Sequence, residues 1–100
     1  MAMKFVILGF DGPEGQIRRK IHRPAHVEKI ENWNKHRRVI LAGPMTDQVG
    51  SLIVIEANSR EEVEEFVKED PYTVFGVFDR VEIHPFIQVF PAEQGEPSRS

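Results

Sequence analysis

The chain has 100 residues, of which 40% are hydrophobic and 29% charged, values typical of one small globular domain. It contains no cysteine, which excludes disulfide scaffolds, thiolate metal sites and cysteine nucleophiles and fits a cytoplasmic protein. No apolar run approaches the roughly 20 residues of a membrane span, and the N-terminus lacks the features of a secretory signal, so we expect no membrane association.

The net charge of −3 is unevenly distributed along the chain. Residues 1–50 carry nine Lys and Arg against five Asp and Glu, whereas residues 51–100 carry four against eleven. Such asymmetry can indicate a nucleic-acid-binding face. Here no aromatic residues are interleaved with the basic ones to stack on bases, so two helices of opposite charge packed on one sheet are the favoured interpretation.

The first half of the chain predicts a strand, a helical region and a second strand. Residues 3–10 are β-branched and aromatic and end at the turn sequence DGPEG. The pattern is helical over residues 16–37, and because proline suits the first turn of a helix, Pro24 predicts a short turn over residues 16–22 and a main helix over residues 24–35. By the three-and-four spacing rule, one face of this helix carries Val27, Ile30, Trp33 and Asn34. Residues 37–45 form the second strand.

The second half predicts a strand, a helix and a final strand. The sequence MTDQVG suits a hairpin into a strand over residues 51–57. Ser59 and Glu62 form a capping box for a helix that ends at Asp70 and Pro71, because a residue before proline avoids the α region. Residues 72–78 are expected to be a loop or short turn, and residues 79–90 a final strand whose proline indicates an edge or bend.

The predicted order β-α-β-β-α-β is that of the ferredoxin-like α+β fold, an antiparallel sheet with both helices on one face. We assign residues 1–90 to this single domain and residues 91–100 to a polar, disordered tail. One chain of this length cannot cover the second face of the sheet. We therefore expect a homodimer that stacks sheet on sheet, an assembly of the dimeric α/β-barrel type.

The candidates for chemistry are histidines and one acid. His22 and His26 have the spacing of two metal ligands on a helix, but Pro24 lies between them and no third ligand is near, so no metal site is expected. No phosphate-binding loop is present either. His26 falls in the first turn of the predicted main helix, where the helix dipole favours a neutral imidazole that can accept a proton. A structural role remains the alternative for a histidine beside an apolar stripe.

Several motifs occur together in the order seen in one family. They are the Arg-x-x-His of Arg23 and His26, the sequence Ala42-Gly43-Pro44, the sequence Asp70-Pro71-Tyr72, and the segment VEIHPF that closes the domain. In combination they make residues 3–90 resemble the YciI (YCII-related) family. The resemblance implies a dimeric ferredoxin-like protein in which His26 and Asp70 form an active-site dyad. The best-defined activity that it implies is dehydrochlorination of a chlorinated hydroxyhydroquinone.

On this basis we expect a cofactor-free lyase or isomerase acting on a small hydroxylated aromatic or quinone ring. His26 and Asp70 are the expected catalytic residues. The expected substrate-binding residues are Arg23, Pro44, Met45, Tyr72, Thr73 and Phe75, although core packing is an equally good interpretation of the phenylalanine. A dimer that binds a small ligand without converting it is the alternative. An RNA-binding domain shares this topology, but the central strands lack exposed stacking aromatics.

Overall fold

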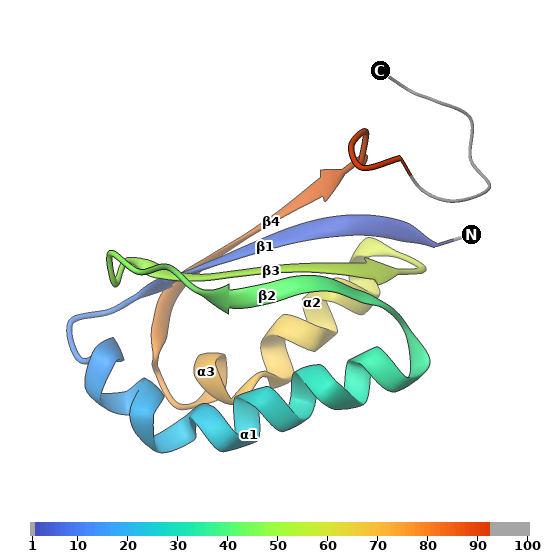
Figure 1. Cartoon of the computed structure of the whole chain (residues 1–100). Helices are drawn as coiled ribbons and strands as arrows, with labels where there is room; N and C mark the ends of the chain where they lie inside the picture. The colour runs from blue at the N-terminus through green and yellow to red at the C-terminus, as the bar shows by residue number, and fades with distance from the viewer. Residues whose placement is uncertain (1, 93–100) are drawn as a thin grey trace.

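The computed structural model describes residues 2–92, and in it three helices lie on one side of a single four-stranded antiparallel sheet (Figure 1). The spatial order of the strands is β2-β3-β1-β4. The strands are β1 (Met3–Asp11), β2 (Val39–Pro44), β3 (Gly50–Ala57) and β4 (Phe78–Phe86), and the helices are α1 (Gly15–His36), α2 (Arg60–Glu69) and the short α3 (Pro71–Val74). The predicted α+β ferredoxin-like fold is confirmed.

The core lies between the two central strands and the helices. Successive side chains of a strand point to opposite faces, and in β1 the residues Phe5 and Ile7 point to the helical side, where they are buried. Their partners across the ladder to β3 are Ile55 and Ile53, which are buried as well. Phe66 of α2 packs on this cluster. Each fully buried side chain of this kind stabilises the fold by about 1.5–3 kcal/mol, so the two central strands fix the position of everything attached to them.

The prediction of two helical pieces before β2 is wrong, because α1 is one helix of 22 residues with Pro24 inside it. Proline there removes the N–H that would bond to the carbonyl of Lys20. The first turns of α1 are nevertheless held by tertiary contacts: the side chains of Gln16 and Arg19 both bind the carboxylate of Asp11 on β1. These contacts offset the local cost of the proline. As a result, His26 lies in the middle of α1 and not in a first turn.

Charges of opposite sign join α1 to α2, as the uneven distribution along the chain predicted. Arg37 binds the Glu62 carboxylate through two nitrogens at 2.7 and 3.2 Å, and the Lys29 ammonium lies 3.7 Å from Glu69. The predicted Ser59 cap is also present, since the Ser59 hydroxyl accepts a hydrogen bond from the Glu62 backbone N–H. The Glu62 carboxylate accepts from the Asn58 N–H, one residue before the N-cap. This part of the charge pattern is therefore explained by helix packing.

The end of the chain differs in detail from the expected one. Within residues 72–78, Tyr72 to Val74 belong to the helical turn α3, which the Asp70 side chain caps. Strand β4 begins one residue early, at Phe78, and stops at Phe86, because its last partner in β1 is Lys4. β4 is an edge strand, as its proline indicated. Of the tail predicted over residues 91–100, all but the first two residues lie outside the described residues.

No helix within residues 2–92 is long and apolar enough to cross a membrane.

Candidate active site

The predicted pairing of His26 with Asp70 is present in the structure. The His26 Nδ1 lies 2.8 Å from the Asp70 Oδ1, a normal hydrogen-bond distance between residues 44 positions apart in the chain. Both side chains are buried, with 7% of His26 and 1% of Asp70 exposed. A buried carboxylate needs hydrogen bonds in place of water, and the imidazole supplies one of them.

Asp70 is positioned by the corner between α2 and α3. It ends α2 in an extended conformation, as the proline that follows requires, and it then caps α3 by accepting a hydrogen bond from the Tyr72 backbone N–H at 2.9 Å. The same Oδ1 atom therefore accepts from Tyr72 and faces Nδ1 of His26. The sequence Asp-Pro-Tyr thus builds a rigid corner that aims one carboxylate at α1.

Tyr72 links this corner to the imidazole. Its ring stacks on the His26 ring, with the centroids 3.8 Å apart and the planes 4° from parallel. The Tyr72 hydroxyl donates a long hydrogen bond of 3.4 Å to the Arg19 carbonyl. Burial raises the pKa of the Tyr72 hydroxyl, against the opposing effect of nearby Arg19 and Arg23. Tyr72 is therefore a neutral wall that holds the imidazole in one orientation.

A cavity of about 210 Å³ opens beside the His26 ring. The apolar wall of this cavity is formed on one side by Val27 and Ile30 of α1. On the other side it is formed by Ala42-Gly43-Pro44 of β2. Its polar lining consists of Arg19, Arg23, His26, Glu31, Ser51 and Tyr72. An apolar cavity of roughly 150 Å³ is enough to hold benzene. The cavity is thus of a size for one small ring with a few substituents.

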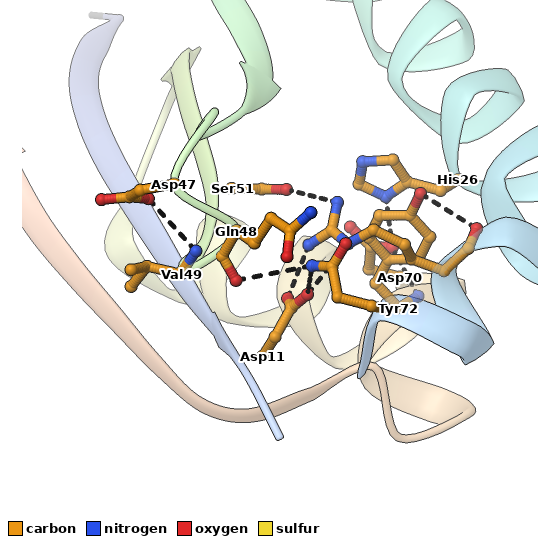
Figure 2. A network of polar contacts seen from close by, with 10 residues as sticks. Asp11, His26, Asp47, Gln48, Val49, Ser51, Asp70 and Tyr72 are labelled. Atoms are coloured by element: carbon orange, nitrogen blue, oxygen red, sulfur yellow. Dashed lines mark hydrogen bonds and ion pairs between the residues drawn. The ribbon is translucent and has the colours of Figure 1, made fainter. Parts of the chain in front are cut away.

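A second polar cluster lies at the same cavity (Figure 2). The Arg19 guanidinium binds the Asp11 carboxylate through Nε at 3.0 Å and Nη2 at 2.6 Å, and its Nη1 donates to the Ser51 hydroxyl at 3.1 Å. The Arg19 side chain is only 12% exposed. Gly50 precedes Ser51 in β3, and a β-carbon at Gly50 would collide with the backbone oxygen of Gly9, so the glycine lets the strands approach there.

The structure brings together some of the predicted binding residues and leaves others outside the cavity. Arg23, Pro44 and Tyr72 line it. The other three, Met45, Thr73 and Phe75, do not. Phe75 is half exposed and stacks on His22, with ring centroids 4.1 Å apart.

Met45 and Thr73 lie outside the lining of the cavity. Met45 belongs to the β2–β3 hairpin, where its backbone N–H binds the Gly50 carbonyl. The Thr73 hydroxyl is buried without a hydrogen-bond partner among residues 2–92. Neither side chain reaches the cavity, since the hairpin and the α3 turn carry them elsewhere.

Sequence reasoning missed Arg19 and Ser51, which line the cavity, and Asp11, which binds the Arg19 guanidinium. Arg19 looks like one of several solvated basic residues in the run Arg18-Arg19-Lys20, and Ser51 looks like the polar start of a strand. The one available signal is Asp11, a carboxylate at the end of an apolar strand. Its partners are 5 and 8 positions away, and Ser51 is a further 32 positions from Arg19, so only the fold brings them together.

Within the described part of the chain, no three His, Asp or Glu side chains gather in a way that could hold a metal ion. His22 and His26 lie on one continuous helix, yet each ring stacks on a different aromatic side chain. His22 stacks on Phe75, and His26 stacks on Tyr72.

Comparison with known proteins identifies the family of the chain. Residues 3–87 match the model of the YCII-related domain. The chain belongs to this family. It is 30% identical over 98 residues to the protein YciI of Escherichia coli O6:H1 and, equally, to that of Shigella flexneri, covering 88% of this chain and 100% of each relative.

Among solved structures, the chain is similar to the 5-chloro-2-hydroxyhydroquinone dehydrochlorinase TftG of Burkholderia phenoliruptrix AC1100, in complex with 2,5-dihydroxybenzoquinone. The TM-score is 0.74 and the identity 29%, over 85% of this chain and 94% of the other. The predicted family relation, including its dehydrochlorinase branch, is confirmed.

Proposed function

We propose that this chain is an enzyme that uses His26 and Asp70, without a cofactor, for acid–base chemistry on a small hydroxylated ring. The observation that supports the proposal is a buried carboxylate–imidazole pair at the wall of a cavity of about 210 Å³. The relative TftG, named as a dehydrochlorinase of a chlorinated hydroxyhydroquinone, supports the same class of substrate. A cytoplasmic location, expected from the sequence, remains a prediction.

The roles of the two residues follow from the hydrogen bond between them. Ionised Asp70 accepts from Nδ1–H of His26, which fixes the tautomer and leaves the lone pair on Nε2. His26 lines the cavity, and its Nε2 has no hydrogen bond to any residue between 2 and 92. Nε2 therefore acts as the general base toward a ring hydroxyl, and Asp70 stabilises the imidazolium that forms. Such a base contributes roughly 10²- to 10⁴-fold in rate.

Dehydrochlorination is the most concrete reaction that this base could serve. Two hydroxyl groups of the ring lose their protons and become carbonyl groups, the carbon that bears chlorine gains one proton, and chloride leaves with the electron pair of its bond. The net loss is one HCl, and no external oxidant is needed because the ring is oxidised as the carbon–chlorine bond is reduced. The His26 imidazolium is a suitable donor of the proton to carbon, because it holds the proton that Nε2 has just taken.

The proposal is tested by turnover of chlorinated and non-chlorinated hydroxyhydroquinones, followed by quinone absorbance and chloride release. We expect the wild-type chain to release chloride and His26→Ala to lose at least about 10²-fold in kcat. His36→Ala is the matched control, because His36 is an exposed histidine of the same helix that does not line the cavity.

Two results would count against the proposal. If no ring is turned over but rings bind in the cavity, the chain is the alternative, a small-ligand-binding dimer of the same family. If His26→Ala and His36→Ala are equally active, the base is not His26.

A further inference from the structure

Two pairs of stacked rings join α1 to α3. The His26 ring stacks on Tyr72 with centroids 3.8 Å apart, and the His22 ring stacks on Phe75 with centroids 4.1 Å apart and planes 2° from parallel. His22 and His26 are four residues apart on α1, so they share one face of that helix. Tyr72 and Phe75 are three residues apart at α3 and share a face in the same way. The contact of His22 with Phe75, called here the outer stack, has no part in the proposed function.

The contact between the two elements extends over three turns of α1. Arg18, His22 and His26 follow one another at intervals of four residues, and each faces α3 or the residue just after it. A β-carbon at Gly76 would collide with the Arg18 guanidinium, and Gly76 has a φ of +73°, a conformation that favours glycine. The chain therefore places a glycine directly after Phe75, where the two elements come close.

The two rings of the outer stack are held mainly by each other. Phe75 is 50% exposed and does not belong to the neighbouring buried cluster of Tyr72, Val77 and Phe78. The His22 ring has no hydrogen bond or ion pair within residues 2–92. Because neither ring is fixed by the core or by a polar partner, their mutual contact is what keeps this turn of α1 against α3.

Pro24 makes the geometry of α1 depend on such contacts. It lies midway between His22 and His26, and its missing N–H leaves one hydrogen bond of the helix unmade at that turn. Helices bend most readily at proline. The two stacks lie on either side of this point, so together they hold both halves of the turn on α3. A bend at Pro24 would rotate the His26 ring away from Asp70, which is positioned separately by the corner between α2 and α3.

We infer that His22 and Phe75 are positioning residues for His26: their stack holds α1 on α3 across Pro24 and keeps the imidazole in line with the Asp70 carboxylate. Neither residue lines the cavity, so both act through His26 and not on a ligand. The geometry that they preserve is the distance of 2.8 Å between His26 Nδ1 and Asp70 Oδ1, in a hydrogen bond that weakens steeply when it is misaligned. The inference rests on the proposed function for its effect on rate, whereas its effect on the ring needs no reaction.

The test observes the His26 ring directly, by NMR of the isotope-labelled chain near neutral pH. In the wild type we expect the Nδ1–H proton that binds Asp70 to exchange slowly with water, and the ring protons to be shifted upfield by Tyr72. Phe75→Ala and His22→Ala should each speed this exchange by roughly 3- to 10-fold, the change in population that the loss of one aromatic pair produces, and should reduce the upfield shift. Phe75→Tyr and His22→Phe keep a flat ring at each position and should give the wild-type signals.

Val74→Ala is the matched control, because Val74 is an apolar residue of α3 that is 59% exposed and directly precedes Phe75. It should leave the His26 signals unchanged. A merely structural contact would lower stability in urea while leaving the His26 ring of the folded protein as in the wild type. The inference is overturned if either Phe75→Ala or His22→Ala, when folded, keeps the wild-type exchange rate and ring shifts, or if Val74→Ala changes them equally. If Phe75→Ala does not fold, His22→Ala decides.

Kinetics give the second readout. If the chain turns over a ring, Phe75→Ala should lower kcat by about 3- to 10-fold and change KM by less than about 2-fold, because the lining of the cavity is intact. If no ring is turned over, the proposed function fails while the NMR result still decides the inference. Unchanged exchange of the His26 proton in an active enzyme would leave the proposed function standing and exclude the positioning role of the outer stack.

Discussion

At the scale of single residues, Asp70 has two roles that the sequence suggested only in part. Its Oδ1 faces His26 and also accepts the Tyr72 N–H, so the carboxylate supports both the proposed base and the start of α3. We expect the fold to survive Asp70→Asn, because this residue is not an apolar core residue. The structure shows that the replacement matters, since only some side chains retain an acceptor at this buried position.

We predict that Asp70→Asn and Asp70→Ala separate these roles. The asparagine oxygen can still accept from Tyr72, so urea denaturation should show little loss of stability. It cannot balance the positive charge of an imidazolium, so kcat should fall, though less than in His26→Ala. Alanine leaves the buried Tyr72 N–H and the imidazole without an acceptor, which should lower the free energy of unfolding by about 1–3 kcal/mol. Equal stability of the two variants would contradict the capping role.

At the scale of elements, Glu62 connects the end of α1 to the start of α2. Its pKa is lowered by the hydrogen bonds from the Arg37 guanidinium and, secondarily, from the Asn58 backbone N–H. A group whose pKa is lower in the folded state stabilises the fold at pH values above its unfolded pKa. That contribution is lost as the pH falls through the folded pKa. For Glu62 this loss lies below its ordinary value of 4.5.

We therefore predict that Glu62→Gln is less stable than the wild type at pH 7, and that the difference shrinks as the pH falls below about 4.5. Urea denaturation across this pH range is the measurement. Glu65→Gln serves as the control, because Glu65 is an exposed residue of the same helix and should show no such convergence. A stability difference for Glu62→Gln that stays constant with pH would show that the ion pair with Arg37 is not its source.

The elements also show where sequence reasoning succeeds. Alternating apolar residues in the strands and the Ser59 cap of α2 are local signals, and both predictions were correct. The break at Pro24 was wrong because contacts from Asp11, distant from the proline, hold the first turns of α1. Propensity is a weak prior that tertiary contacts override.

The residues of the candidate site likewise fall into those that the sequence predicted and those that it did not indicate. The pairing of His26 with Asp70 was predicted through the family resemblance, and composition or spacing alone would have left His26 as a structural residue. Arg19 and Ser51 carry no local signal, because a basic residue in a helix and a serine at a strand start are common on protein surfaces. Only the register of β3 against β1 and the packing of α1 bring them to one cavity.

At the scale of the whole molecule, the helices cover one face of the sheet, and no segment within residues 2–92 covers the other (Figure 1). The centre of this open face is apolar. Val6 pairs with Val54 and Leu8 with Leu52 across β1 and β3, and all four point away from the helices because they alternate with the core residues. Charged residues lie around this centre: Lys4, Glu56, Arg80 and Glu82. An apolar centre with a charged rim is typical of an interface between chains.

We predict that two chains pair through this face and form a homodimer. Light scattering at micromolar concentration should give twice the 11.5 kDa of one chain. Leu8→Glu and Leu52→Glu should give monomers, because each places a charge where the dimer would exclude water. Ile17→Glu is the matched control: Ile17 is 68% exposed on α1, on the opposite side of the molecule, and its replacement should leave the mass unchanged. A monomeric wild type, or a dimer that survives Leu8→Glu and Leu52→Glu, would show that the open face is not the interface.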